Sequence, residues 1–448
     1  IENTRFHVID SLLKYVKQDV EKRYERSMKI DKILLHPIFA LPIFFLFMLV
    51  FLVCIFHISK PWTNWINDML YGGAFFSFVL QDFPLIRQLF VDGILAGLSG
   101  VLSFVPLMAC LYIALGILEE SGYMARIAFL LDRIMRQFHL SGKSFVALLM
   151  GFGCNVPAIY ASKTLDGEGL KKRCALLVPF MSCGARLPVY SLFCAAFFPD
   201  KEIFVLVCLY GIGILVALVF GIILYHGDRK KEKDIFVLEV PPYRLPRLSI
   251  IWKKAKKEVQ AYVKKACGIV LFAMCILWCF SYSPTQHIED SLLAKGAKQV
   301  SFLFEPLGFG NRWECVASLP GGILAKETIV GYFSSLQSTQ QKQEPVKLGW
   351  EDIKERTTTS ISQTLFLSKE EPQEKDTSYI QNLWHDERRN LRAFSFLVYI
   401  LLSVPCIMTL QALYHTYGKK VMLTSIVAML VIPYIVSFCI FQFFSLFY

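Results

Sequence analysis

Long uncharged apolar stretches recur along the chain, separated by shorter polar segments. The clearest are 93–118, 203–225 and 421–448, and each exceeds the roughly 20 residues that a helix needs to cross the hydrocarbon core of a membrane. Further apolar segments lie at 38–56, 174–199, 266–283, 313–336 and 393–414. The pattern predicts an all-α polytopic membrane protein with about eight transmembrane helices.

The segment 144–162 is also apolar, but bases flank it on both sides, with Lys143 before it and Lys163 and Lys171 after it. A full crossing would put one basic cluster outside, so we expect a re-entrant or broken helix here. The basic amphipathic segment 4–32 places the N-terminus in the cytoplasm. We expect loop 59–92 to be external and loops 226–265 and 337–392 to be cytoplasmic, as is the C-terminus.

Composition narrows the class of protein further. Apolar residues make up 55% of the chain and the formal net charge is +11. The bases lie mostly in loops beside apolar segments, so membrane topology explains the charge better than nucleic-acid binding does. The 13 cysteines lie mostly inside apolar segments without zinc-type pairs, which is not typical of a disulfide framework or a structural zinc site.

The most informative motif is Gly-Phe-Gly-Cys-Asn-Val-Pro at 151–157. Two glycines and Pro157 weaken a helix here, and Pro157 disfavours helix in the two residues before it. Broken backbone persists in a bilayer only where it lines a polar site. Freed carbonyls, the Asn155 amide and the Cys154 sulfur together suit a cation, although a simple packing kink is the alternative.

A second motif, 181–188, begins at Met181 and contains Cys183 and Arg186. A charged arginine inside a span is expensive and therefore a functional candidate. Arg186 can hold the carbonyls of a broken helix or neutralise a carboxylate; otherwise it reaches the membrane surface.

Two later spans carry further candidates. Lys326 and Glu327 follow Pro-Gly-Gly at 320–322, and Cys406 follows Pro405 with Met408 close by. Glu327 is a candidate partner of Arg186 or of a bound cation, or else part of an ion pair at a helix end. Thiolate and thioether ligands favour transition metals over Mg²⁺ or Ca²⁺.

Glu119 and Glu120 end the second predicted span, where they can gather cations at an inner mouth or cap a helix. Elsewhere, Ser-Gly-Lys-Ser at 141–144 looks like the end of a P-loop, but Gln137 stands where that motif needs glycine. We find no nucleotide-binding motif and no hydrolase motif in this chain.

Several long motifs resemble the membrane region of the ferrous iron transport protein FeoB. They are LEESGYMARIAFLLDRIMR at 118–136, GKSFVALLMGFGCNVPAIYASKTL at 142–165, PFMSCGARLPVYSLF at 179–193, PPYRLP at 241–246, LPGGILAKETIVGY at 319–332 and LVYILLSVPCIMTL at 397–410. The resemblance runs from about residue 5 to residue 440. Residues 411–418 depart from the basic-acidic pair that the family often carries there.

The resemblance implies Fe²⁺ transport across the bacterial inner membrane, with Cys154, Cys183 and Cys406 as pathway cysteines. It implies two gate-type modules, arranged as an inverted repeat. It also implies an N-terminal GTPase domain upstream of this chain, the only place where GTP and Mg²⁺ would bind. A small cytoplasmic FeoA-type partner and a homo-oligomer are compatible with it.

We therefore expect the following division: a coupling helix at 1–35, a first helix and external loop at 36–92, gate modules at 93–200 and 313–414, connecting helices at 201–312, and a last helix at 415–448. Two other functions stay open at this point. One is a nucleoside-type or other solute carrier on the same gate fold, and the other is a membrane receptor that does not transport.

Overall fold

The structure is a computed structural model. It describes residues 24–72 except 26, 33, 35, 37 and 38, and then residues 95–227, 242–281, 290–324, 326, 328–338, 357–360, 362–364 and 378–446. These residues are helical in large part and include no β-strand. The all-α membrane fold predicted from the sequence is confirmed.

The helices follow one another along the chain, and many are joined by short turns. The α-helices are α2 (Ala40–Gly72), α5 (Ala96–Ser121), α6 (Tyr123–Gln137), α7 (Gly142–Gly153), α8 (Asn155–Ser162), α9 (Glu168–Leu177), α10 (Leu187–Phe197), α11 (Glu202–Gly227), α12 (Leu248–Ser281), α13 (Leu292–Phe304), α14 (Trp313–Leu324), α15 (Thr328–Ser338), α17 (Ser378–Gln381), α18 (Arg389–Leu402), α19 (Ile407–Tyr417) and α20 (Lys419–Ser445). Short 3₁₀ turns include η2 (Val178–Phe180), η3 (Gly184–Arg186) and η5 (Glu305–Leu307).

Six segments among the described residues are long and apolar enough to cross a membrane. They are Pro42–Asn67, Val101–Ser121, Glu168–Phe197, Glu202–Gly227, Arg389–Tyr417 and Lys419–Ser445. Helix α11 shows why: Ile203, Phe204 and Val207 are 79%, 67% and 64% exposed, which suits lipid rather than water. The other two predicted crossings fall on α12 and on the α14–α15 pair, so the count of eight stays a prediction.

Four of the helical segments are interrupted. The α7–α8 segment is interrupted at Cys154, α9–α10 at 178–186, α14–α15 between Leu324 and Thr328, and α18–α19 at 403–406. Each half of the chain thus has a short broken pair followed by a longer broken segment. The two predicted modules and their inverted relation stay predictions.

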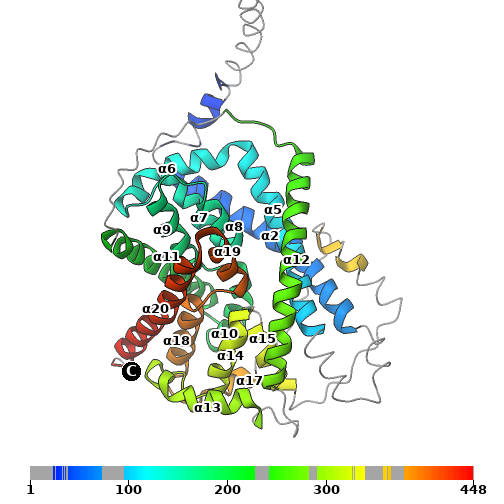
Figure 1. Cartoon of the computed structure of the whole chain (residues 1–448), viewed down its shortest axis with the longest axis vertical. Coiled ribbons are helices and arrows are strands. Elements are labelled where there is room, and N and C mark those ends of the chain that lie inside the picture. Colours follow the sequence, from blue (N-terminus) through cyan, green and yellow to red (C-terminus); the bar gives the residue numbers. More distant parts are fainter. Residues whose placement is uncertain are drawn as a thin grey trace, which may run out of the picture.

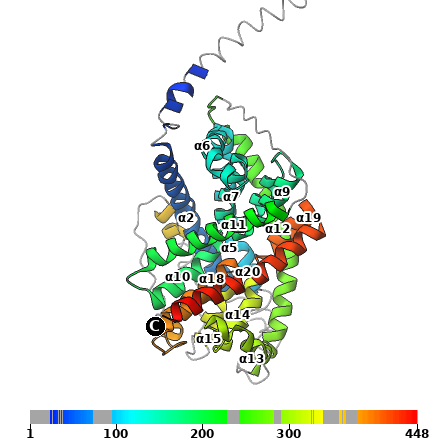
Figure 2. The same cartoon turned by 90° about the vertical axis from the view of Figure 1, so that its left-hand side faces the viewer.

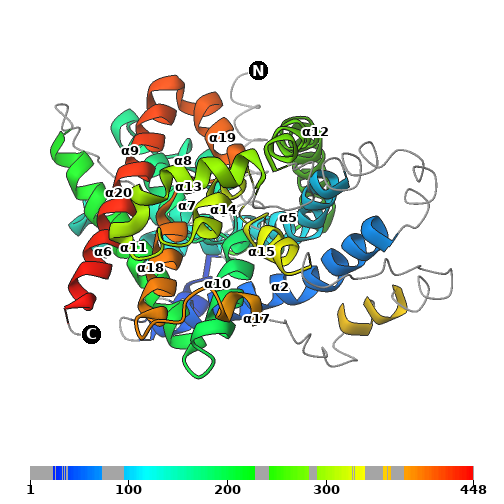
Figure 3. The same cartoon turned by 90° about the horizontal axis from the view of Figure 1, so that it is seen from below.

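The interrupted helices lie between two outer groups of helices. Figures 1 and 3 show α2, α5 and α12 together on one side, and α11 and α20 on the other. Figure 2 places α6 and α7 towards one end and α13 and α15 towards the other. The interruptions therefore meet in the interior, between the outer groups.

An aromatic core fixes the second-half helices against α10. The ring of Phe193 in α10 lies 5.4 Å from that of Phe333 in α15 and 5.1 Å from that of Phe396 in α18. Phe309, in the turn after η5, lies 5.2 Å from Phe396. Such pairs contribute about 0.5–1.5 kcal/mol each beyond the burial of their area, so this core holds α10, α15 and α18 in place.

The predicted sides of two loops do not agree with the structure. Helix α2 runs on to Gly72, through the first part of the predicted external loop. There, His57 Nε2 lies 3.0 Å from the carbonyl oxygen of Gln363, and Trp65 Nε1 donates to Thr357 Oγ1 at 2.9 Å. Segments 59–72 and 357–364 therefore lie together, and their assignment to opposite sides of the membrane is wrong. Polarity identifies a loop but does not show which side it occupies.

The predicted cytoplasmic loop 226–265 is also shorter than expected. Helix α12 begins at Leu248 and continues for 34 residues. The basic half of α12 is helical because it packs on α5: Ile251 is 2% exposed and Ala255 is 3% exposed. Of the predicted basic leader 4–32, residues 24, 25 and 27–32 are helical, and the rest lies outside the described residues.

Candidate metal pathway

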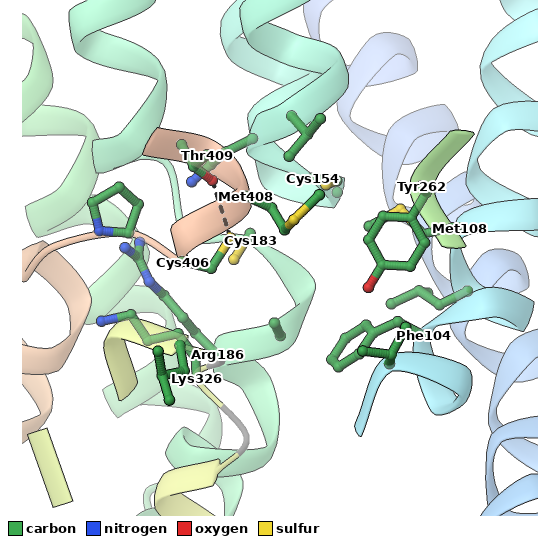
Figure 4. Close-up of a pocket in the computed structure, with 18 of the residues that line it drawn as sticks. Phe104, Met108, Cys154, Cys183, Arg186, Tyr262, Lys326, Cys406, Met408 and Thr409 are labelled. Carbon is green, nitrogen blue, oxygen red and sulfur yellow. Dashed lines mark hydrogen bonds between the residues drawn. The ribbon is translucent and has the colours of Figure 1, made fainter. Parts of the chain in front are cut away.

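The four helix interruptions line one internal cavity, shown in Figure 4. Each interruption contributes a polar or sulfur side chain: Cys154, Cys183 with Arg186, Lys326, and Cys406 with Met408. Helices α5 and α12 form the opposite wall. Residues as far apart in the chain as Val101 and Thr409 therefore share one space.

The first interruption is a single residue. Cys154 is extended, with φ −152° and ψ 132°, and its N–H still donates to the carbonyl of Met150 at 3.0 Å. Pro157 lies in the first turn of α8, so the expectation that it breaks the helix at Asn155 and Val156 is wrong. A proline is tolerated there because first-turn N–H groups have no partner within the helix.

The second interruption packs directly against the first. A methyl group built on Gly184 would lie 3.6 Å from the carbonyl oxygen of Gly153 and 2.9 Å from the ring of Phe56. Only a residue without a side chain fits there without a shift of the neighbouring ring. Cys183 and Cys154 are thereby brought to the same cavity.

Arg186 is fully buried and stabilises the second interruption. Its guanidinium donates to the carbonyl of Met181 at 3.2 Å and to that of Pro179 at 3.3 Å. These carbonyls belong to the turn where α9 and η2 end, which leaves them without helical partners. Met181 itself packs against Gly151 and supplies a carbonyl to Arg186.

Lys326 stabilises the interruption between α18 and α19 in the same way, by donating hydrogen bonds. It is 3% exposed, and its ammonium donates to Ser403 Oγ at 2.7 Å and to the carbonyl of Ile400 at 3.5 Å. Lys326 thus joins the α14–α15 interruption to the end of α18. Glu327, which the sequence suggested as a partner of Arg186 or of a bound cation, lies outside the described residues.

Asn155 also connects two interruptions. When its amide nitrogen faces the nearby carbonyls, it donates to Gly151 at 3.1 Å and to Val178 at 3.3 Å. The amide oxygen is then the atom left to face a ligand. Cys406 lies 3.1 Å from Thr409 Oγ1, and Met408 is 8% exposed.

The three cysteines share the cavity without forming a ready metal centre. In the part of the chain that the structure describes, no three His, Cys, Asp or Glu side chains are grouped closely enough to hold a metal ion. A metal in this cavity would need neutral donors, such as Met408 or backbone carbonyls, in addition to thiolates. Such an incomplete shell is suited to passage of an ion rather than to its storage.

Glu119 and Glu120 lie away from the cavity lining. Glu119 forms an ion pair with Lys254 of α12 at 2.6 Å, and Glu120 accepts from the N–H of Arg247 at 2.8 Å. These two carboxylates fasten the end of α5 to α12. The cation-gathering role considered for them from the sequence stays a hypothesis.

Sequence reasoning missed the wall opposite the cysteines. That wall includes Phe104 and Met108 from α5 and Tyr262 from α12. Tyr262 lay in the predicted basic loop. The alternation of apolar and basic residues after Leu248 was the signal that could have revealed a helix there.

Comparison with known proteins adds to this geometry. Residues 101–197 match the family model of the gate domain, described as nucleoside recognition. The protein is a multi-pass membrane protein with a gate domain built from interrupted helices.

Residues 206–257 match the model described as ferrous iron transport protein B C terminus. The chain is 34% identical to the Fe(2+) transporter FeoB of Staphylococcus aureus strain MSSA476 over 99% of its own length and 63% of that protein. It is 30% identical to the FeoB proteins of Methanocaldococcus jannaschii and Legionella pneumophila strain Philadelphia 1, over 98% of the chain and 62% of each relative.

These matches are similarities over part of a longer protein, since the chain spans a little under two thirds of the length of these relatives. No solved structure gives a significant match.

Proposed function

We propose that this chain forms the membrane pathway of a ferrous iron transporter and moves Fe²⁺ into the bacterial cytoplasm. Relatives named Fe(2+) transporter FeoB, similar over nearly the whole chain, support the substrate. The observation that carries the proposal is the cavity, where four helix interruptions meet and three cysteines face the wall formed by α5 and α12. The membrane part then acts as a transporter and not as an enzyme.

In this proposal Fe²⁺ exchanges water for ligands at the helix interruptions. Thiolates of Cys154, Cys183 and Cys406 supply the charged ligands. Cysteine ligands lose their protons on metal binding, and the buried positive charges of Arg186 and Lys326 compensate the thiolates. Because no complete ligand set is preformed, the ion leaves as readily as it binds.

The proposal extends to the setting of the chain. The pathway lies in the inner membrane with both termini cytoplasmic, and an N-terminal GTPase domain with its GTP and Mg²⁺ drives it. The greater length of the relatives supports a further domain. A small FeoA-type partner and self-association would act on this assembly from the cytoplasmic side.

Downhill flux through the isolated chain tests the proposal. The chain is reconstituted into liposomes that contain an Fe²⁺-sensing dye, and an inward Fe²⁺ gradient is applied under anaerobic conditions. We expect dye quenching that saturates with Fe²⁺ and is absent from empty liposomes. Equal quenching rates in the two preparations at every gradient would show that the chain is not a pathway for Fe²⁺.

A further inference from the structure

The first turns of α12 carry an exposed face that combines apolar and basic side chains. Leu248 is 69% exposed and Trp252 is 62% exposed, and Lys253, Lys256 and Lys257 are exposed as well. Leu248, Trp252 and Lys256 follow one another at intervals of four residues, so they lie in one row along the helix. Lys253 and Lys257 form the next row. The five side chains therefore share one continuous surface.

The opposite face of the same turns is buried against α5. Ile251 and Ala255 are 2% and 3% exposed, and a methyl group built on Gly116 of α5 would lie 2.9 Å from the side chain of Ile251. Because an α-helix turns by about 100° per residue, Lys253 and Lys257 lie on the far side of α12 from these two buried residues. The basic surface therefore faces away from α5.

Contacts with α5 place this surface at the level of a membrane boundary. The membrane-spanning segment of α5 is Val101–Ser121, and Glu119, near its end, pairs with Lys254 of α12 at 2.6 Å. Trp252 and Lys257 lie within three residues of Lys254, which is about 4.5 Å or less along the helix axis. Figure 1 shows the start of α12 at the same end of the molecule as α6, which follows α5. The surface thus lies at the depth of lipid headgroups.

The lysines of this surface lack a neutralising carboxylate within the described part of the chain. There, no ion pair is found for Lys253, Lys256 or Lys257, whereas the neighbouring Lys254 pairs with Glu119. Lysines at a membrane boundary attract anionic lipids. Tryptophan is also enriched at this depth, because its ring is apolar and its N–H is polar. The side chains of this surface therefore suit a ligand with a negative headgroup and apolar chains.

We propose that the outward face of α12 around Trp252 is a binding site for anionic phospholipids of the phosphatidylglycerol type. The ammonium groups of Lys253, Lys256 and Lys257 donate to the phosphate oxygens, and Trp252 contacts the glycerol backbone and the first part of the acyl chains. A bound lipid holds the start of α12, the helix that also carries Tyr262 of the cavity wall. The site lies outside the cavity and does not rest on the proposed iron transport.

Quenching of Trp252 fluorescence by brominated lipids tests this site. The full chain is reconstituted into bilayers of phosphatidylglycerol and phosphatidylcholine in equal amounts, with bromine on one lipid or on the other. The chain has seven tryptophans, so the Trp252 signal is the difference between the unaltered chain and Trp252→Phe. We expect brominated phosphatidylglycerol to quench this signal more strongly, and we expect the difference to shrink as salt is raised.

A double variant, Lys256→Gln with Lys257→Gln, removes two of the three proposed charges. Each lysine near a membrane surface strengthens attraction to anionic lipid by about fivefold, so we expect the preference for phosphatidylglycerol at Trp252 to fall by about tenfold or more. The matched control is Lys419→Gln with Lys420→Gln. These two lysines are adjacent and exposed at the start of α20, on the other side of the molecule from α12, and their replacement should leave the preference unchanged.

Several results would overturn the proposal. One is equal quenching by the two labelled lipids in the unaltered chain, and another is no quenching by either, which would show that Trp252 does not contact lipid. Both are measured without altering the lysines, so they do not depend on the folding of the lysine variants. A preference that survives the double variant, or that falls equally in the control, would also contradict the site. Because no iron is present, failure here leaves the Fe²⁺ flux experiment unaffected.

Discussion

At the scale of single residues, buried positive charges make the interruptions possible. Each broken helix leaves carbonyls without helical partners, and these cannot turn to water inside the protein. Arg186 donates hydrogen bonds to the carbonyls of the turn at 179–181, and Lys326 donates to a carbonyl at the end of α18. We infer that both residues hold the backbone of the pathway rather than bind the transported ion directly.

Arg186→Met tests that role. The change leaves two buried carbonyls without donors, so we expect a loss of about 2–4 kcal/mol in the free energy of unfolding. Thermal or denaturant unfolding in detergent measures it. Arg136→Met is the control: Arg136 is exposed and pairs with Asp132 on the surface of α6, where about 0.5 kcal/mol or less is expected. Equal effects in the two variants would contradict the assigned role.

Some of these residues could be predicted from the sequence and others could not. The local motif Gly-Phe-Gly-Cys-Asn-Val-Pro at 151–157 predicts a broken helix, so Cys154 could be identified as a candidate site residue from the sequence. The bond from Lys326 to Ser403 joins positions 77 apart, and no local pattern encodes such a contact. The part of the cavity wall formed by Tyr262 was not predicted, because the basic residues in the first half of α12 are typical of a cytoplasmic loop.

At the scale of elements, a polar clasp joins three segments at one end of α5. Arg126 of α6 is 2% exposed and donates to both carboxylate oxygens of Asp31, at 2.7 and 3.1 Å. The guanidinium also lies 3.6 Å from the ring centre of Tyr243, in the segment that leads into α12. Because α5 and α12 form one wall of the cavity, the clasp fixes the position of that wall.

A double-mutant cycle measures the clasp. Asp31→Asn and Arg126→Gln remove the same bidentate pair, so we expect their combined effect to fall short of the sum by about 1–3 kcal/mol of unfolding free energy. The pair Glu168 and Lys171, at 3.0 Å with Glu168 largely exposed, should give about 0.5 kcal/mol or less. Additive effects of Asp31→Asn and Arg126→Gln would show that the clasp does not couple the segments.

The junction between α6 and α7 depends on a close backbone approach. A methyl group on Gly142 would lie 1.9 Å from the carbonyl oxygen of Ala128. We therefore expect Gly142→Ala to cost about 1–3 kcal/mol, since two backbones must move apart. Gly296→Ala in α13 meets nothing within 4 Å and should stabilise by about 0.5–1 kcal/mol. The unfolding midpoints of the two variants and of the unaltered chain are measured in the same detergent. A Gly142→Ala midpoint at or above that of the unaltered chain would contradict the close approach of the two backbones.

At the scale of the whole molecule, interrupted helices are enclosed by intact ones. The helical type of the elements followed from the apolar lengths, so the all-α membrane fold was predictable, while the count of eight crossings stays a prediction. The sides of loops 59–92 and 337–392 were not, because their contact is made by tertiary packing between α2 and segment 357–364. The cavity likewise exists only once both halves of the chain have packed together.

The central claim is that Fe²⁺ passes through the cavity at the helix interruptions, and uptake by a Cys154→Ser variant tests it most directly. Fe²⁺ flux into liposomes is compared for the unaltered chain, Cys154→Ser, and the control Cys279→Ser, whose thiol is exposed on α12. We predict a loss of about tenfold or more in Cys154→Ser and none in the control. Full flux in Cys154→Ser would contradict the account.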